Sequence, residues 1–111
     1  MKQDLEIKIQ VKQILRVIEK IAPGKSVELR VPPYAAIQCV KGGNHRRGTP
    51  PSVVEMSAQT LLRLSKSPQS WDQVCSEGAI SASGTNSNLA AIFNRVSKLG
   101  ANIDEELSDG K

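Results

Sequence analysis

The chain has 111 residues and a formal net charge of +4 at pH 7, and 39% of its residues are hydrophobic. This length predicts a single core and leaves little chain for a separate catalytic domain. Tyr34, Trp71 and Phe93 are its only aromatic residues, too few for a platform on which nucleic-acid bases stack. We therefore expect one domain over residues 1–100 and a short acidic tail over residues 101–111.

The composition argues against metal, cofactor and catalytic chemistry. Cys39 and Cys75 are far apart and His45 is the only histidine, which makes a poor ligand set for a metal and pairs no nucleophile with a base. No apolar leader precedes the charged start, and no apolar run is long enough to span a bilayer. We expect a cytoplasmic protein with reduced thiols, no cofactor, no metal and no enzymatic activity.

Hydrophobic spacing predicts a long amphipathic helix at the start of the chain. Apolar residues recur at helical intervals from residue 7 to residue 21, and Pro23-Gly24 ends the pattern. The opposite face mixes acids with bases, which favours packing against a core over docking on a membrane surface.

Four strands and three further helices are predicted after this helix. The strands cover residues 26–31, 34–41, 53–56 and 79–83, and the helices cover 58–64, 71–76 and 87–99. Ser57 is expected to cap the first of these helices, and Ser70 with Gln73 fits a capping box at the second. Gly100 is expected to end the last helix. Ala35, Ile37 and Cys39 lie on one face of 34–41, and the other face, with Ala36, Gln38 and Val40, is only weakly polar, so we expect this strand to be covered on both sides.

The loop between the second and third strands carries an unusual cluster of polar groups. Its candidate anion-binding residues are His45, Arg46, Arg47 and Thr49. Guanidinium groups match carboxylates and phosphates in geometry, but the lysine and the following helix of a nucleotide-binding loop are missing. The alternative is a solvated loop whose arginines pair with acids such as Glu28 or Glu55.

The order of elements over residues 53–99 resembles the sterol carrier protein 2 fold. In that family a strand leads into a helix, matched here at Leu61-Leu62, and a strand between two glycines follows, here from Gly78 to Gly84. The segments VELRVPPYAAIQCVKG and RGTPPSVVEM are more similar still to bacterial sterol carrier orthologues, whose H-x-R-G-T-P-P string is matched by residues 45–51. The resemblance covers residues 14–99. It implies an α+β domain with a mostly antiparallel sheet of four or five strands covered by helices.

The resemblance also implies a non-enzymatic carrier that holds a lipid-like hydrophobic molecule between its sheet and its helices. The apolar wall of that cavity is expected to consist of Ile37, Leu61, Leu62, Trp71, Ile80 and Phe93. Arg46 and Arg47 would meet an anionic head. Two alternatives stay open: an interaction or enzyme accessory module that binds a protein partner or a second copy without lipid, and a weak binder of nucleic acid or another polyanion.

Overall fold

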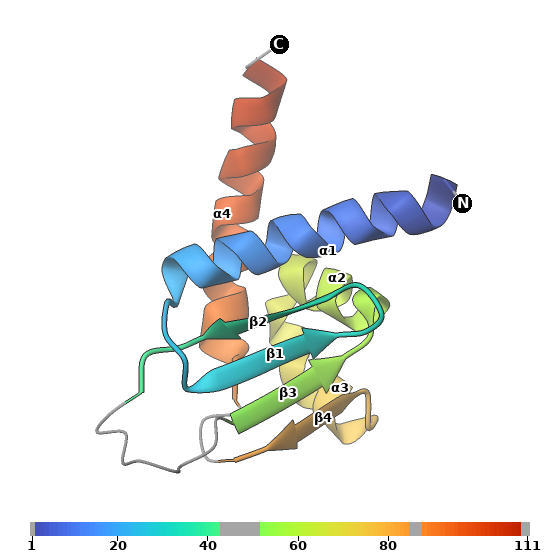
Figure 1. Ribbon diagram of the computed structural model, residues 1–111. Coiled ribbons are helices and arrows are strands. Elements are labelled where there is room, and N and C mark those ends of the chain that lie inside the picture. Colours follow the sequence, from blue (N-terminus) through green and yellow to red (C-terminus); the bar gives the residue numbers. More distant parts are fainter. Residues whose placement is uncertain (1, 43–51, 85–87, 110–111) are drawn as a thin grey trace.

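The structure is a computed structural model that describes residues 2–42, 52–84 and 88–109, with the backbone alone described at residues 2–3 and 100–109. Within these ranges, a four-stranded sheet carries helices on one of its faces (Figure 1). The expected α+β architecture is therefore confirmed.

The sheet is mixed, with antiparallel pairs at both edges and a parallel pair at the centre. Its strands are β1 (Val27–Val31), β2 (Ala35–Cys39), β3 (Ser52–Met56) and β4 (Ile80–Ser83), in the order β2-β1-β3-β4. β1 pairs antiparallel with β2, and β3 with β4. Val27 of β1 lies opposite Ser52 of β3 in the parallel pair. The four strands in the described part of the chain agree with the predicted ones to within two residues at each end.

The helices are α1 (Lys2–Ile21), α2 (Ala58–Lys66), the short 3-10 helix η1 (Pro68–Ser70), α3 (Trp71–Ser76) and α4 (Ala90–Asp109). Val27, Leu29 and Val31 alternate along β1 with more accessible residues, and all three are fully buried. They join one core cluster with residues from the helices, among them Leu15, Ile18, Leu61 and Phe93. The alternation in the sequence thus turns one face of the sheet toward the helices.

The opposite face of the sheet is polar and accessible in the ranges that the structure describes. Ala36 and Gln38 of β2 are exposed there, so the prediction that this strand is covered on both sides is wrong. The neighbouring strand explains the difference, because Glu28 and Arg30 of β1 form an ion pair and lie beside Gln38 and Ala36. A pair of charged side chains keeps this face in water.

One predicted helix cap is confirmed and the other is wrong. The amide of Thr60 donates to Ser57 Oγ at 3.2 Å and caps α2 as expected. Ser70 makes no side-chain cap for α3, because its hydroxyl donates to the carbonyl of Ser67 at 2.7 Å. The Gln73 amide donates to Glu77 Oε2 instead, at 3.1 Å. The Ser70 hydroxyl, which the capping box would need, is therefore occupied by the 3-10 turn before α3.

The last helix is longer than the sequence suggests. α4 begins at Ala90, whose amide donates to Asn88 Oδ1 at 3.0 Å, and it continues through Gly100 to Asp109. A glycine inside a helix costs about 1 kcal/mol, so Gly100 weakens the helix without ending it. Arg95 Nη1 donates to the carbonyl of Ile21 at 3.0 Å, which ties α4 to the end of α1.

A tight corner fixes the end of α1 against the end of β2. Val40 has a φ of 67°, which is rare for a β-branched residue. Both the amide and the hydroxyl of Ser26 donate to the Val40 carbonyl, at 3.0 and 2.7 Å, and the Val40 amide donates to Ala22 at 2.7 Å. Gly24 packs directly on the backbone of Val40 and Lys41. These contacts hold the unusual backbone in place and set how α1 lies over β2.

Candidate functional site

Most of the predicted apolar wall lies in the core. Leu61 and Phe93 are fully buried and Trp71 is 5% exposed, while Leu62 and Ile80 are half-buried. The rings of Trp71 and Phe93 stack with their centroids 6.1 Å apart. α2, α3 and α4 carry these aromatic and leucine side chains. Leu61, Trp71 and Phe93 belong to the core cluster and Ile80 packs against it, as expected, whereas Leu62 is not part of it. The role of all five as a ligand wall stays a prediction.

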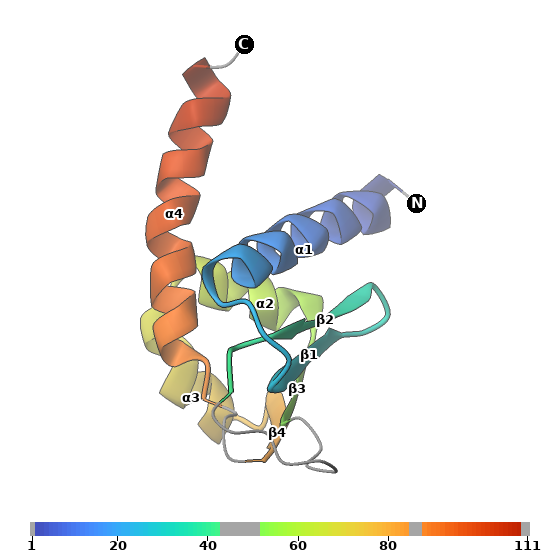
Figure 2. The same cartoon turned by 60° about the vertical axis from the view of Figure 1, so that its left-hand side comes forward.

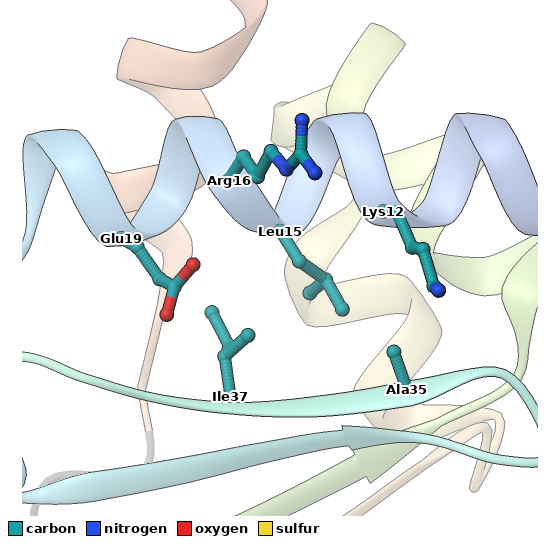
Figure 3. A pocket seen from close by; sticks show the side chains of 6 residues that line it. All are labelled: Lys12, Leu15, Arg16, Glu19, Ala35 and Ile37. Atoms are coloured by element: carbon teal, nitrogen blue, oxygen red, sulfur yellow. The ribbon is translucent and has the colours of Figure 1, made fainter.

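Ile37 lies elsewhere, in a groove between α1 and the edge strand β2 (Figure 3). The groove has a volume of about 150 Å³ and is lined by Lys12, Leu15, Arg16, Glu19, Ala35 and Ile37. Of the four hollows described here, this one and a neighbour contain Ile37, and none of the four contains any of the other five predicted wall residues. We call it the α1–β2 groove.

The α1–β2 groove combines an apolar floor with a charged rim. Ala35 and Ile37 point from β2 toward α1, and Leu15 points back at them (Figure 3). Lys12 reaches down at the Ala35 end and Glu19 at the Ile37 end. The α1 flank therefore places the Lys12 ammonium at one end of the groove and the Glu19 carboxylate at the other, around apolar side chains, while the Arg16 guanidinium points away from β2 (Figure 3). An amphiphile would complement this groove, because its hydrocarbon chain would contact the apolar side chains and its charged head would contact the rim.

A second hollow adjoins the groove along β2. It has a volume of about 430 Å³ and shares Glu19 and Ile37 with the α1–β2 groove. Gly24 and Lys25 of the corner between α1 and β1 line its other side, together with Ala36 and Gln38. Because two residues belong to both hollows, they form adjoining depressions along the outer edge of the sheet.

Sequence reasoning missed the α1 side of this groove. Lys12, Arg16 and Glu19 have the i, i+4, i+7 spacing of one helix flank, so they could have been grouped from the sequence. Which flank of the helix borders the sheet depends on how α1 packs on β2, a contact between residues about twenty positions apart. That packing cannot be read from the spacing of one helix.

The predicted anion-binding residues His45, Arg46, Arg47 and Thr49 lie outside the described residues. The structure does bear on one of the acids named as their alternative partners. Glu28 already pairs with Arg30, and the pKa of the Arg30 guanidinium is raised, first by its hydrogen bond to Glu28 and then by the charge of the same carboxylate. A loop arginine would have to compete with Arg30 for Glu28.

The two cysteines differ in burial but share the direction of their pKa shifts. Burial and, to a smaller extent, the charge of Glu19 raise the pKa of the Cys39 thiol to about 11. The pKa of the more exposed Cys75 is also raised, by partial burial and then by Asp72. A thiol with a raised pKa is protonated near neutral pH and is a weak nucleophile and metal ligand.

Among the described residues, no three His, Cys, Asp or Glu side chains lie together so that they could hold a metal ion. No helix within the described ranges is long and apolar enough to cross a membrane.

Helices over one face of a small mixed sheet make an α+β domain, an architecture consistent with the sterol carrier protein 2 type. The sequence agrees with this class. Residues 3–94 match the family model described as bacterial SCP ortholog, and the chain belongs to that family. A comparison with curated proteins gives no match.

Proposed function

We propose that this protein binds a lipid-like hydrophobic molecule and carries it without changing it chemically. The observation that carries the proposal is the α1–β2 groove, in which apolar side chains lie below a helix flank that carries Lys12, Arg16 and Glu19. Membership of the bacterial SCP ortholog family supports it, because that family takes its name from sterol carriers.

The groove is the proposed entrance for the hydrocarbon chain. Its volume of about 150 Å³ is smaller than the roughly 300–1,000 Å³ of a typical ligand pocket. A lipid therefore needs more space than the groove alone provides. The adjoining hollow that shares Ile37 and Glu19 supplies part of it. The rest comes from the core beyond Leu15, where we place the wall of Leu61, Leu62, Trp71, Ile80 and Phe93.

Lys12 and Arg16 are the proposed contacts for an anionic head. Both are exposed at the groove rim, where a long cationic side chain can lie along the ligand and keep its charge in water. His45, Arg46, Arg47 and Thr49 are a second group of candidates for the same role.

The high pKa of the Cys39 thiol supports a role without covalent chemistry. The free thiols of Cys39 and Cys75 fit a reducing, cytoplasmic location.

Native mass spectrometry of the purified protein, followed by organic extraction, tests the proposal. We expect a lipid or fatty acid bound near one per chain, or uptake of added palmitate. Ile37→Trp should fill the groove and abolish uptake. The matched control is Ser81→Trp, which places the same side chain at an exposed position of β4 and should leave uptake intact. A clean apo mass with no uptake of fatty acid or sterol would reject the carrier and favour a partner-binding module.

A further inference from the structure

The α1–β2 groove carries opposite charges at its two ends. The Lys12 ammonium reaches toward Ala35 and the Glu19 carboxylate reaches toward Ile37, with Leu15 between them (Figure 3). Lys12 and Glu19 are seven positions apart on α1, and seven residues of helix span about 10.5 Å. A ligand that follows the groove therefore meets a cation at one end and a carboxylate at the other.

The groove is accessible from outside the protein. The last part of α4 projects away from the sheet in both views, so it does not cover the groove (Figures 1 and 2). Lys12 and Glu19 are exposed, and Ala35 and Ile37 are half-buried. A chain that enters the groove would therefore displace water from its apolar floor and from the charged groups at both ends.

The Glu19 carboxylate forms no hydrogen bond or ion pair with the residues that the structure describes. The ion pairs in this part of the chain are on β1 and between α2 and the residue after α3, and neither contains a residue that lines the groove. The carboxylate is nevertheless close to β2, since burial raises the pKa of the Cys39 thiol to about 11 and the charge of Glu19 adds to the rise. Glu19 is thus an acceptor beside the apolar floor that a ligand can engage.

The chemistry of a carboxylate determines which ligand group fits beside Glu19. An ionised carboxylate accepts hydrogen bonds and donates none. A hydrocarbon chain that lies against Glu19 displaces water without replacing its hydrogen bonds, which costs free energy. A hydroxyl at that point of the chain donates a hydrogen bond to the carboxylate and brings no charge onto the apolar floor, whereas a second carboxylate is repelled.

We propose that the protein selects a fatty acid with a hydroxyl group in the middle of its chain, which places its carboxylate at Lys12 and donates its hydroxyl to Glu19. An extended chain advances about 3.5 Å for every three single bonds, so a span of about 10.5 Å corresponds to about nine bonds and puts the hydroxyl near carbon 10. The chain beyond it continues toward the adjoining hollow of about 430 Å³, which shares Glu19 and Ile37 with the groove. This selection rests on the proposed carrier function and names the ligand class for the same groove.

The charges around the groove also set the direction in which the ligand lies. Lys25 lines the adjoining hollow, but Glu19 lines it too, so an anionic head placed there would be opposed by the carboxylate. Arg16 lines the groove between its ends, and its guanidinium points away from β2 (Figure 3). Lys12 is the cation at the end farthest from Glu19, so the head is attracted there with the least repulsion.

Displacement of a fluorescent fatty acid measures the affinity of four ligands that differ at one position. We expect 10-hydroxyoctadecanoate to bind about threefold to tenfold more tightly than octadecanoate, because its hydroxyl replaces a hydrogen bond that Glu19 would otherwise lose. The other two ligands should bind no more tightly than octadecanoate. One is 10-oxooctadecanoate, which has an oxygen at the same carbon but no proton to donate. The other is 2-hydroxyoctadecanoate, which carries its hydroxyl beside the head.

Glu19→Ala should remove the preference, so that the hydroxylated and the plain chain bind equally well. Glu6→Ala is the matched control, because it removes a carboxylate from an exposed α1 position that does not line the groove, and it should keep the preference. Circular dichroism shows whether each variant folds, and the comparison of four ligands on the unchanged protein does not depend on the variants.

The outcomes separate this selection from the carrier function. Equal affinity for octadecanoate, 10-hydroxyoctadecanoate and 10-oxooctadecanoate would overturn the selection and leave the carrier intact. A preference that survives Glu19→Ala in a folded protein would overturn the role of Glu19. If none of the four fatty acids binds, the carrier function itself is rejected, and the selection with it.

Discussion

The two halves of the helical layer are packed differently. Around Trp71 and Phe93, aromatic and leucine side chains are buried and in contact. Along α1 and β2, smaller apolar side chains leave a groove bordered by charge. Ala35 and Ile37 are only half-buried there, although they lie on the inner face of the sheet. We therefore expect substitutions in the aromatic half to cost more stability than substitutions at Ala35 or Ile37, and we propose that the α1–β2 half opens for a ligand at a lower energetic cost.

The largest expected effect is a loss of stability when the aromatic half is emptied. Phe93 is fully buried, so Phe93→Ala should lower the free energy of unfolding by about 3–5 kcal/mol. Ile37→Ala should cost roughly 1 kcal/mol, because Ile37 is half-buried beside existing space. Urea denaturation of both variants measures the difference. Equal losses at the two positions would remove the distinction between the halves.

The corner beside the groove should be nearly as sensitive. A Cβ at Gly24 would overlap the backbone of Val40 and Lys41, so Gly24→Ala should cost about 2 kcal/mol or more and disturb the packing of α1 on β2. Gly78→Ala is the control, since φ is +77° there but the space around it is open. It should cost about 1 kcal/mol. Thermal unfolding measures the melting temperature of both variants. An equal shift in the two would mean that backbone strain, and not the overlap with Val40 and Lys41, determines the loss of stability.

Elements with strong local signals were predictable from the sequence. The alternation in β1, the apolar stripe of α1 and the Ser57 cap each depend on residues close together in the chain. The capping box at Ser70 failed because Ser67, three residues earlier, already accepts its hydroxyl. The stop at Gly100 failed because a single glycine only weakens a helix.

The site was harder to predict than the fold. The burial of Leu61, Trp71 and Phe93 could be predicted because large apolar residues on amphipathic elements tend to be buried, while their role as a ligand wall stays a prediction. The α1–β2 groove depends on how two elements meet, and no local pattern specifies that. Ile37 was selected as an apolar strand residue, but its neighbours Lys12 and Glu19 come from another element. The proposed anion-binding loop stays a prediction, since it lies outside the described residues.

The Cys39 thiol should make the protein less stable in alkaline solution. Its pKa is about 11 in the folded chain, against an ordinary value of 9.0. Between these values the unfolded chain has lost the proton that the folded chain keeps, so the free energy of unfolding falls as pH rises. The contribution is on the order of 2 kcal/mol.

Urea denaturation at pH 8 and pH 10.5, compared with Cys39→Val, isolates this effect from other titrating groups. The free energy of unfolding of the Cys39→Val protein should fall less between these two pH values than that of the unchanged protein. A parallel measurement with a thiol reagent should label exposed Cys75 first and buried Cys39 only after unfolding. Rapid labelling of Cys39 in the folded protein would show that the α1–β2 half opens readily without ligand.

The smallest expected effect concerns the charged rim of the groove. Lys12→Ala should weaken palmitate binding by about twofold to fivefold, because an exposed ion pair contributes at most about 1 kcal/mol. Lys20→Ala removes the same charge from an exposed α1 position that does not line the groove, and should leave the affinity unchanged. Hexadecanol, which has the chain without the charge, should bind the Lys12→Ala protein and the unchanged protein equally well. If Lys12→Ala weakens both ligands to the same extent, Lys12 contacts the hydrocarbon chain rather than the head, and the anionic head must lie elsewhere on the protein.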